Sequence, residues 1–311
     1  MRSDRAKQKR KKKRWIIVGV VLLLLLVGAG AYAYSIYHSL TKAVNTMHTP
    51  IKRESTRVEE ITFQRQDPFS VLMLGVDERK GDRGRSDTMI VLTVNPNPTF
   101  KSVQMLSIPR DTRVEIVGKG KEDKINHAYA FGGVEMSMDT VEKFLDIPID
   151  YYIKVNMEGF KDIVDALNGI TVNNDLNFSY EGNHFKKGQI HLDGKEALSF
   201  VRMRKEDPRG DFGRQERQRQ VIQGVISKGA SFTSLTRFND VFKALGKNVE
   251  TNITFDEMKS IQKYYKDARE KIEPFQLTGQ GTKIDGIYYF IVPKEEIQNV
   301  QSRLKKHLEL Q

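Results

Sequence analysis

The sequence contains no cysteine, which excludes disulfide bridges, metal sites built on thiolates and a thiol nucleophile. Its six histidines are scattered along the chain without the spacing of metal ligands, so we interpret them as structural. No internal repeat is visible either. What remains is a chain of 311 residues, long enough for one large domain or two small ones.

The positive charge of the chain is concentrated at its N-terminus. Residues 1–14 contain nine Lys or Arg against one Asp, a net charge of +8 out of the total of +11. The other residues together carry only +3, which argues against a body that binds nucleic acid through its general charge. We therefore expect a basic tail at 1–14 and no nucleic-acid partner.

An uncharged apolar run over residues 15–34 follows this tail. Twenty helical residues reach about 30 Å, the thickness of the hydrocarbon core of a bilayer. Trp15 lies at one end of the run, and Tyr34 and Tyr37 lie at the other, as is typical of residues at a membrane interface. The pattern predicts a transmembrane signal-anchor helix over 15–37, with the cytoplasmic membrane as a partner.

The charge on the two sides of this run predicts its orientation. Nine cations precede it, whereas only Lys42 and Lys52 lie among the first eighteen residues after it. Positive charge favours the cytoplasmic side, so we expect a single-pass protein whose later residues lie outside the cell. A cleaved signal peptide ending near Ala33 is the alternative, but the apolar run is longer than usual for one. Residues 38–67 are polar, without clear periodicity, and are predicted to form an extracytoplasmic stalk.

The folded part is predicted to extend over residues 68–308 as one domain of alternating strands and helices. Short apolar runs predict buried strands, and periodic patterns with capping signals predict helices. The predicted strands are 69–76, 88–94, 102–108 and 287–292, and the predicted helices are 134–145, 157–167, 214–228, 235–245, 254–269 and 293–308.

Three aspartates and an arginine lie at the ends of the first three predicted strands. If these strands run up, down and up, then Asp77, Asp87, Arg110 and Asp111 gather at one edge of the sheet, where α/β folds tend to bind ligands. Two carboxylates beside basic residues are suited to a Mg²⁺ that also binds phosphate oxygens. The alternative for Asp77 and Asp87 is ordinary turn capping and solvation.

Six arginines lie within the eighteen residues from Arg202 to Arg219. The guanidinium fork matches phosphate oxygens two at a time. If 199–204 is extended, Arg202 and Arg204 share one face, and if the chain is helical from Arg214, Gln218 lies one turn further on. Two such pairs of donors suit a diphosphate.

A second interpretation of this stretch remains open. Glu206, Asp211 and Glu216 lie among the arginines and would form ion pairs along a solvated helix.

Five sequence blocks together resemble the LytR–CpsA–Psr family over about residues 68–220. The blocks are Leu74-Gly-Val-Asp77, Arg85-Ser-Asp87-Thr88, Ser107-Ile-Pro-Arg110-Asp111-Thr112, Lys124-Ile-Asn126-His-Ala128, and Arg202-x-Arg204 with Arg214-x-x-x-Gln218. Each block alone is weak, but the five in this order are specific. The resemblance extends to the LytR-type members, which attach wall teichoic acid.

The resemblance implies a fold and an activity. The implied fold is a single three-layer α/β/α domain with a mixed central sheet and a hydrophobic tunnel for a lipid tail. The implied activity is that of an extracytoplasmic phosphotransferase, which moves an anionic glycopolymer from a polyprenyl-diphosphate carrier to a peptidoglycan hydroxyl and forms a phosphodiester.

The resemblance also implies roles for particular residues. Asp77 and Asp87 match the aspartates linked to Mg²⁺, for which Mn²⁺ is an alternative, and with Arg85 and Arg110 they form the implied catalytic set. The implied diphosphate-binding residues are Arg85, Arg110, Lys124, Asn126, Arg202, Arg204, Arg214 and Gln218. Lys124 and Asn126 belong to the weakest of the five blocks.

Three other functions compete with transfer. A carrier-diphosphate hydrolase would use the same site with water as acceptor, a wall-binding protein would keep the arginines without catalysis, and a membrane-tethered regulator would bind nucleic acid. The sequence shows no nucleophile with a base beside it, which favours direct transfer over a covalent intermediate. It also shows no recognition-helix motif.

Overall fold

The computed structural model describes residues 26–28, 30–78, 84–230, 241, 245–246 and 248–310. The predicted basic tail lies outside these residues, as do residues 15–25 and 29 of the predicted membrane span and most of the predicted helix 235–245. Within the described ranges, no helix combines the length and the apolar character needed to cross a membrane.

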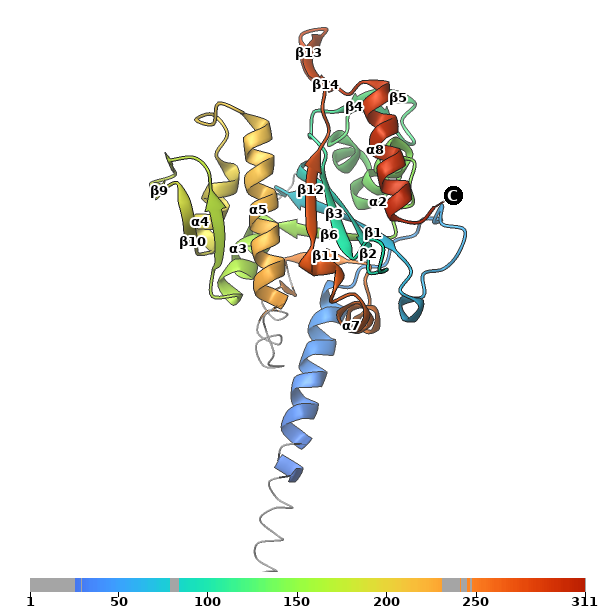
Figure 1. The fold of residues 1–311 in the computed structure, drawn as a ribbon, viewed down its shortest axis with the longest axis vertical. Helices are drawn as coiled ribbons and strands as arrows, with labels where there is room; N and C mark the ends of the chain where they lie inside the picture. The colour runs from blue at the N-terminus through green and yellow to red at the C-terminus, as the bar shows by residue number, and fades with distance from the viewer. Residues whose placement is uncertain are drawn as a thin grey trace, which may run out of the picture.

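A six-stranded mixed sheet forms the centre of the fold (Figure 1). In spatial order its strands are β11 (Val249–Thr251), β6 (Tyr151–Asn156), β1 (Phe69–Val76), β2 (Ser86–Asn95), β3 (Ser102–Ser107) and β12 (Ile272–Gln276). Strands β1, β2 and β3 are antiparallel neighbours, as predicted, whereas β6 and β12 pair in parallel with β1 and β3. The sheet is therefore mixed.

Helices cover both faces of this sheet, and their bounds agree closely with several of the predictions. The helices are α2 (His127–Leu145), α3 (Met157–Ala166), α4 (Gly194–Arg202), α5 (Asp211–Ala230), α7 (Phe255–Tyr264) and α8 (Lys294–His307), with 3-10 turns η1 (Phe63–Arg65) and η2 (Ala268–Glu270). Capping boxes open α4 at Asp193 and α7 at Thr254. Helix α2 begins earlier than predicted and continues past the non-helical Gly133.

Alternate residues of β1 belong to different cores because successive strand side chains point to opposite faces. Leu72 and Leu74 pack in one core with α2 and α8, whereas Val71 packs in a second core that includes Ile222 of α5 and Ile261 of α7. The sheet is covered on both faces, which explains why the strand sequences are continuously apolar.

Four small antiparallel hairpins and ribbons complete the fold. They are β4 (Arg113–Ile116) with β5 (Lys121–Lys124), β7 (Ile170–Asn174) with β10 (Gly188–Leu192), β8 (Phe178–Tyr180) with β9 (Asn183–Phe185), and β13 (Gln280–Ile284) with β14 (Ile287–Ile291). The sequence predicted only the last of these eight strands. Figure 1 shows the β13–β14 hairpin projecting at the end of the molecule opposite the N-terminal helix.

The segment predicted to be a stalk lies against the domain. Residues 30–47 are helical, and Val44 and Met47 of this helix are fully or almost fully buried. Further along, Arg53 pairs with Glu142 at 2.6 Å, Arg57 pairs with Asp150 at 2.5 Å, and Phe63 packs in the second core. These contacts hold the segment on the surface of the domain, which differs from a free spacer.

Candidate active site

An elongated cavity of 730 Å³ lies between the central sheet and α5. Its wall is mostly apolar, with Met73 from β1, Val155 from β6, and Val221 and Ile226 from α5. Such a wall is suited to a hydrocarbon ligand, because polar groups are few and placed together.

The cavity follows α5 along its length. Arg214 and Gln218 line it near the start of this helix, and Gly229 lines it near the end. Fifteen residues of α-helix correspond to about 22 Å. The lining also includes Met258 of α7, which packs in one core with Ile226 of α5, and Met47 at the C-terminal end of helix 30–47, which packs in one cluster with Met258. One end of the cavity is therefore polar, and the other lies beside helix 30–47.

The two predicted metal-linked aspartates lie together at the polar end. Asp77 directly follows β1 and Asp87 is the second residue of β2, and both line the cavity. They come together because Val76 is the antiparallel partner of Ser86, with a register shift beside it. The gathering at one sheet edge that the strand pattern predicted is thus present.

Arg110 reaches this pair from the loop after β3. Its Nη1 donates a very short hydrogen bond to Asp87 Oδ1, and its Nε lies 3.7 Å from Asp111 Oδ2. Burial alone would lower the pKa of Arg110, but the hydrogen bond to Asp87 and the charges of Asp87 and Asp111 outweigh burial and raise that pKa. The guanidinium is therefore a permanent cation.

Arg214 and Gln218 share one face of α5, as the spacing of four predicted. Arg214 is only 9% exposed, and its Nη2 lies 2.6 Å from Asp211 Oδ1. Burial lowers its pKa, the charge of Asp211 opposes this, and the charge of Arg110 adds to it. Within the described chain, the buried Nε atoms of Arg214 and Arg110 have no hydrogen-bond acceptor. These donors point to an anionic ligand.

Arg202 and Arg204 do not lie on one extended strand, and that conditional prediction is wrong. Helix α4 continues to Arg202, because its capping box starts a helix whose apolar residues Ala197 and Phe200 are buried. Arg202 lines the cavity, with Nη1 3.8 Å from Glu181 Oε1. Arg204 is exposed in the turn that follows, near enough for its charge to lower the pKa of Arg214.

The other predicted site residues lie outside the cavity wall. Lys124 Nζ is 2.7 Å from Asp111 Oδ1, which joins it to the Arg110 group. Asn126 is buried behind this group, and its backbone N–H donates to the backbone carbonyl of Arg110 at 3.3 Å. Arg85 is exposed, and its carbonyl accepts from the amide of Asp77 at 3.4 Å.

Three of the six arginines in the stretch 202–219 have structural contacts instead. Arg217 is fully buried, with Nη1 2.5 Å from Asp207 Oδ2 and Nε 2.9 Å from Phe200 O. Arg209 pairs with Asp207, Asp175 and Glu216, and Arg219 donates to Ser107 Oγ at 2.9 Å. The ion-pair interpretation therefore holds for part of this stretch, while Arg202 and Arg214 line the cavity.

Sequence reasoning missed Tyr180 and Glu181, which line the cavity from the turn between β8 and β9. The only visible signal was Gly182, which marks that turn. Asp211, which holds Arg214, was assigned to a general ion-pair pattern and not to the site.

The donor set fits a Mg²⁺ ion that shares its coordination with a ligand. Among the described residues, no three His, Asp or Glu side chains gather as a metal site. Two carboxylates, Asp77 and Asp87, line the same polar end. Mg²⁺ in phosphate-transferring sites is commonly held by one or two carboxylates together with phosphate oxygens, so the pair fits this type of site.

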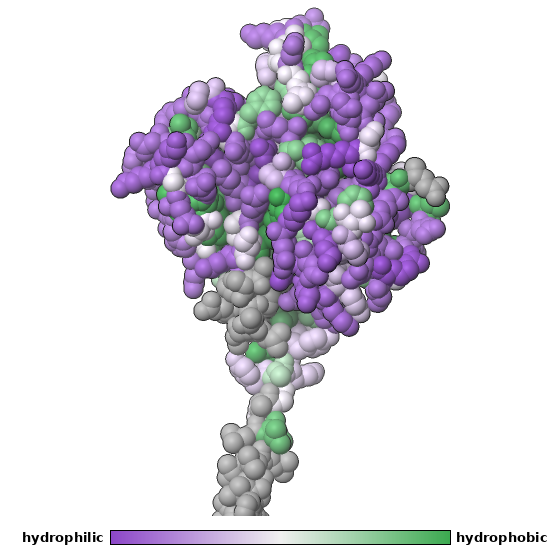
Figure 2. All heavy atoms as spheres, in the orientation of Figure 1, coloured by the Kyte–Doolittle hydropathy of each residue, from purple (hydrophilic) through white to green (hydrophobic). Residues whose placement is uncertain are grey.

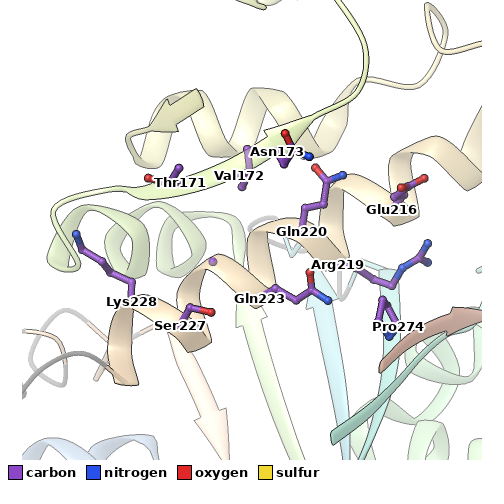
Figure 3. A pocket seen from close by; sticks show the side chains of 11 residues that line it. Thr171, Val172, Asn173, Glu216, Arg219, Gln220, Gln223, Ser227, Lys228 and Pro274 are labelled. Carbon is purple, nitrogen blue, oxygen red and sulfur yellow. The ribbon is translucent and has the colours of Figure 1, made fainter. Parts of the chain in front are cut away.

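A second hollow, of 830 Å³, lies on a different face of α5 (Figure 3). Gln220, Gln223, Ser227 and Lys228 project from α5 into it, opposite Asn173 of β7. It contains none of the predicted site residues. Of the two hollows, only the apolar cavity is lined by predicted site residues.

A mixed sheet with helices on both faces, and an apolar cavity with arginines and carboxylates at one end, place the chain among α/β proteins with a deep apolar site. Comparison with known families makes the class specific. Residues 34–306 match the LytR_cpsA_psr family, and the chain belongs to this family.

Named relatives agree with this assignment. The polyisoprenyl-teichoic acid–peptidoglycan teichoic acid transferase TagU of Bacillus subtilis (strain 168) is 55% identical over 282 residues, which cover 91% of this chain and 92% of that protein. The crystal structure of B. subtilis TagU matches with a TM-score of 0.64 and 54% identity, covering 79% of this chain and 98% of that one. A structure of TagT bound to LI-WTA has a TM-score of 0.71 and 33% identity, covering 85% and 100%.

Proposed function

We propose that this protein transfers an anionic glycopolymer of the wall teichoic acid type from a polyprenyl-diphosphate carrier to a hydroxyl of peptidoglycan. A phosphodiester forms, and polyprenyl phosphate leaves. The observation that carries the proposal is the cavity along α5, which is apolar for most of its length and ends at Asp77, Asp87, Arg202 and Arg214. Arg110 lies beside this end, bonded to Asp87. The names of the relatives TagU and TagT support it.

The cavity fits the two chemical halves of such a carrier. The apolar wall, which includes Met73 and Ile226, would hold the prenyl chain, because burying hydrocarbon is favourable by about 0.8 kcal/mol per CH₂ group. The diphosphate would then lie between Arg214 and Arg110. Two guanidinium forks neutralise its two negative charges and bind the phosphate oxygens in pairs.

The arginines act by position and charge. Arg110 and Arg214 are held by Asp87 and Asp211, so their orientation is set before substrate arrives. Phosphoryl transfer passes through a transition state with charge spread over the phosphate oxygens, which preorganised cations stabilise. The apolar surroundings strengthen this attraction, because the local dielectric constant is low.

Mg²⁺ belongs to the proposal as a cofactor held by Asp77 and Asp87. When bound, it would neutralise charge on the diphosphate. The placement of the enzyme is also proposed: N-terminus in the cytoplasm, span at 15–37, and domain on the outer side of the cytoplasmic membrane. The cavity end beside helix 30–47 supports this placement, because the prenyl chain would then point toward the bilayer.

The test uses the full chain in detergent micelles, a polyprenyl-diphosphate carrier with a labelled glycopolymer, and peptidoglycan fragments. We expect label joined to the glycan through a phosphodiester, with activity lost in EDTA and restored by Mg²⁺. Release of free polymer phosphate without attachment would identify a hydrolase instead. Full activity in EDTA would remove Mg²⁺ from the proposal.

A substitution that narrows the cavity tests whether the cavity binds the prenyl chain. Ile226→Trp places a larger side chain in the apolar wall. It is expected to raise the KM for a long-chain carrier by about tenfold, as loss of about 1.4 kcal/mol of binding would, while a short-chain analogue is affected less. Val58→Trp is the control, since Val58 is 99% exposed. Equal effects on both carriers would count against prenyl binding here.

A further inference from the structure

The β13–β14 hairpin carries exposed apolar side chains at the projecting end of the molecule. Ile287 is 50% exposed and Tyr288 is 46% exposed, two of the few large hydrophobic residues on the surface of the described domain. Figure 2 shows hydrophobic atoms at this projecting end, on a face that is otherwise largely hydrophilic. Exposed apolar groups that gather on a projecting element are typical of a binding surface.

The base of this hairpin is attached to the candidate active site. The amide of Phe290 donates to Asp111 O at 2.8 Å, and Thr112 forms a parallel bridge with Phe290. The ring of Phe290 also packs edge-on against Phe212 at 5.5 Å, next to Asp211 in the first turn of α5. Strand β14 thus lies between the loop that carries Arg110 and the helix that carries Arg214.

Tyr288 shares a strand face with Phe290, two residues away. Its side chain lies over Gly281 of β13, where an added Cβ would be only 2.5 Å from the tyrosine Oη. The glycine therefore leaves room for the ring. Burial and the negative charges of Asp111 and Asp211 raise the pKa of Tyr288, so the phenol stays protonated and able to donate at neutral pH.

The opposite face of β14 is also joined to the site. The ring of Tyr289 lies 5.9 Å from Lys124 Nζ and 5.8 Å from the guanidinium carbon of Arg113. Lys124 in turn pairs with Asp111. The hairpin is therefore fixed on both faces to groups around the polar end of the cavity, while Tyr288 and Ile287 stay open to solvent.

We propose that Tyr288 is the docking platform for a sugar ring of the acceptor glycan, an inference that rests on the proposed function. The prenyl chain would enter beside helix 30–47, so the acceptor must approach from the other end, where the hairpin projects (Figure 1). A pyranose has an apolar C–H face and a polar rim. Tyrosine offers a matching apolar ring and polar tip.

Position distinguishes this occupant from the bilayer. Helix 30–47 lies at the end of the molecule opposite the hairpin (Figure 1), which argues against lipid as the occupant.

The experiment measures acceptor use and acceptor binding separately in the full chain. Tyr288→Ala is expected to raise both the acceptor KM and the Kd for a soluble glycan oligomer, measured by calorimetry, by about tenfold, the effect of losing about 1.4 kcal/mol. The donor KM and the turnover at saturating acceptor stay unchanged. Tyr288→Phe keeps the ring and stays within about twofold of wild type.

Gly281→Val is the second variant, because it displaces the tyrosine ring without removing it. It should weaken glycan binding in the same direction. Thr282→Ala is the control, an exposed residue opposite Tyr289 on the other face of the hairpin. A melting temperature close to wild type shows that each variant is folded.

Wild-type glycan affinity in both Tyr288→Ala and Gly281→Val would overturn the inference. Weaker association with anionic lipid vesicles, at unchanged glycan affinity, would overturn it in favour of a membrane contact. The calorimetric measurement of glycan binding does not require turnover. An absence of transfer by the wild-type protein therefore refutes the proposed function and leaves the binding result to decide the inference.

Discussion

Arginines only a few residues apart in the sequence have different contacts and different roles in this protein. Arg217 is buried and saturated by Asp207 and backbone carbonyls, whereas Arg214 faces the cavity with a buried Nε that no described acceptor satisfies. Burial of a charge is tolerable only when it is paired or when a ligand of opposite charge binds it. The pairing of each arginine therefore predicts the effect of replacing it.

Arg110 is predicted to be the most sensitive cation of the site. Arg110→Ala should lower turnover about a hundredfold or more, the usual effect of losing one transition-state donor. Arg110→Lys keeps the charge but loses the fork that contacts Asp87, and should fall between this variant and wild type. Steady-state transfer kinetics measure both.

The control for Arg110 is Arg65→Ala, which removes an exposed arginine paired with Asp67 in η1. Turnover should stay within about twofold of wild type, since surface pairs contribute little. Near-wild-type turnover in Arg110→Ala would contradict its assigned role.

Asp207 is predicted to matter for stability. Burial alone would raise its pKa, but hydrogen bonds from Arg209 and Arg217 lower it to about 2. Asp207→Asn leaves Arg217 buried without its counter-ion and should cost about 3–5 kcal/mol. Urea unfolding at pH 7 measures this cost, with the exposed neighbour Glu206→Gln as the control.

The same carboxyl gives a pH dependence with a defined sign. Its pKa is lower in the folded than in the unfolded protein, so its stabilising effect is complete above about pH 4 and is lost toward pH 2. Asp207→Asn should lack this part of the acid sensitivity. An unchanged acid profile in the variant would show that the pair does not act this way.

Helix α5 is the element on which cavity and arginine stretch both depend. Its Gly213 lies against the Asp207 loop, and an added Cβ would be 1.9 Å from Asp207 Oδ2. Gly213→Ala should therefore destabilise the fold by about 1–3 kcal/mol, as overpacking does, and lower turnover because Arg214 is the next residue. Thermal and urea unfolding, together with transfer assays, measure these effects.

Gly229→Ala is the matched control on the same helix, because nothing lies within 4 Å of a Cβ there. It should be neutral or slightly stabilising, since alanine favours helix over glycine. Equal destabilisation by both substitutions would mean that the close approach to Asp207 is not the cause.

Local signals in the sequence predicted the elements that depend on local physics. A capping residue predicted the start of α7, and the spacing of Arg214 and Gln218 predicted their common face. The end of α4 was not predictable, because it depends on burial of Phe200 in a distant core. Most of the small hairpins were missed for a similar reason: their polar, glycine-containing strands have no clear alternation.

The candidate site was predictable where strand order alone brings residues together. Asp77, Asp87 and Arg110 follow from three antiparallel strands. The partners Glu181 and Asp211 did not follow, because their contacts to Arg202 and Arg214 arise only after the turn at 180–182 and helix α5 have packed. Long-range pairing is set by tertiary structure, not by local pattern.

A buried histidine near the C-terminus attaches the last helix to the central sheet. His307, at the end of α8, contacts Thr93 Oγ1 of β2 at 2.8 Å and Ser102 Oγ of β3 at 3.0 Å. Burial lowers its pKa to about 4, against the opposing charge of Glu273. The neutral imidazole therefore joins the last helix to two central strands.

Stability is predicted to depend on this histidine in mildly acidic solution. The unfolded chain binds the proton near pH 6.5 and the folded chain only near pH 4, so stability falls by about 3 kcal/mol as the pH drops through that window. His307→Gln should flatten the profile there, whereas His184→Gln, on an exposed site, should not. Urea midpoints between pH 7 and pH 4 decide the matter.

Only one end of the cavity carries charged groups, and this affects how the polyprenyl phosphate can leave after transfer. Arg110 and Arg214 lie at one end, and the other lies beside helix 30–47. Under the proposed function, the discharged isoprenoid can withdraw along its own entry path, tail first, into the lipid leaflet. Its exit need not cross open water, so recycling of the carrier and arrival of a new glycan occur at opposite ends of the enzyme and do not obstruct each other.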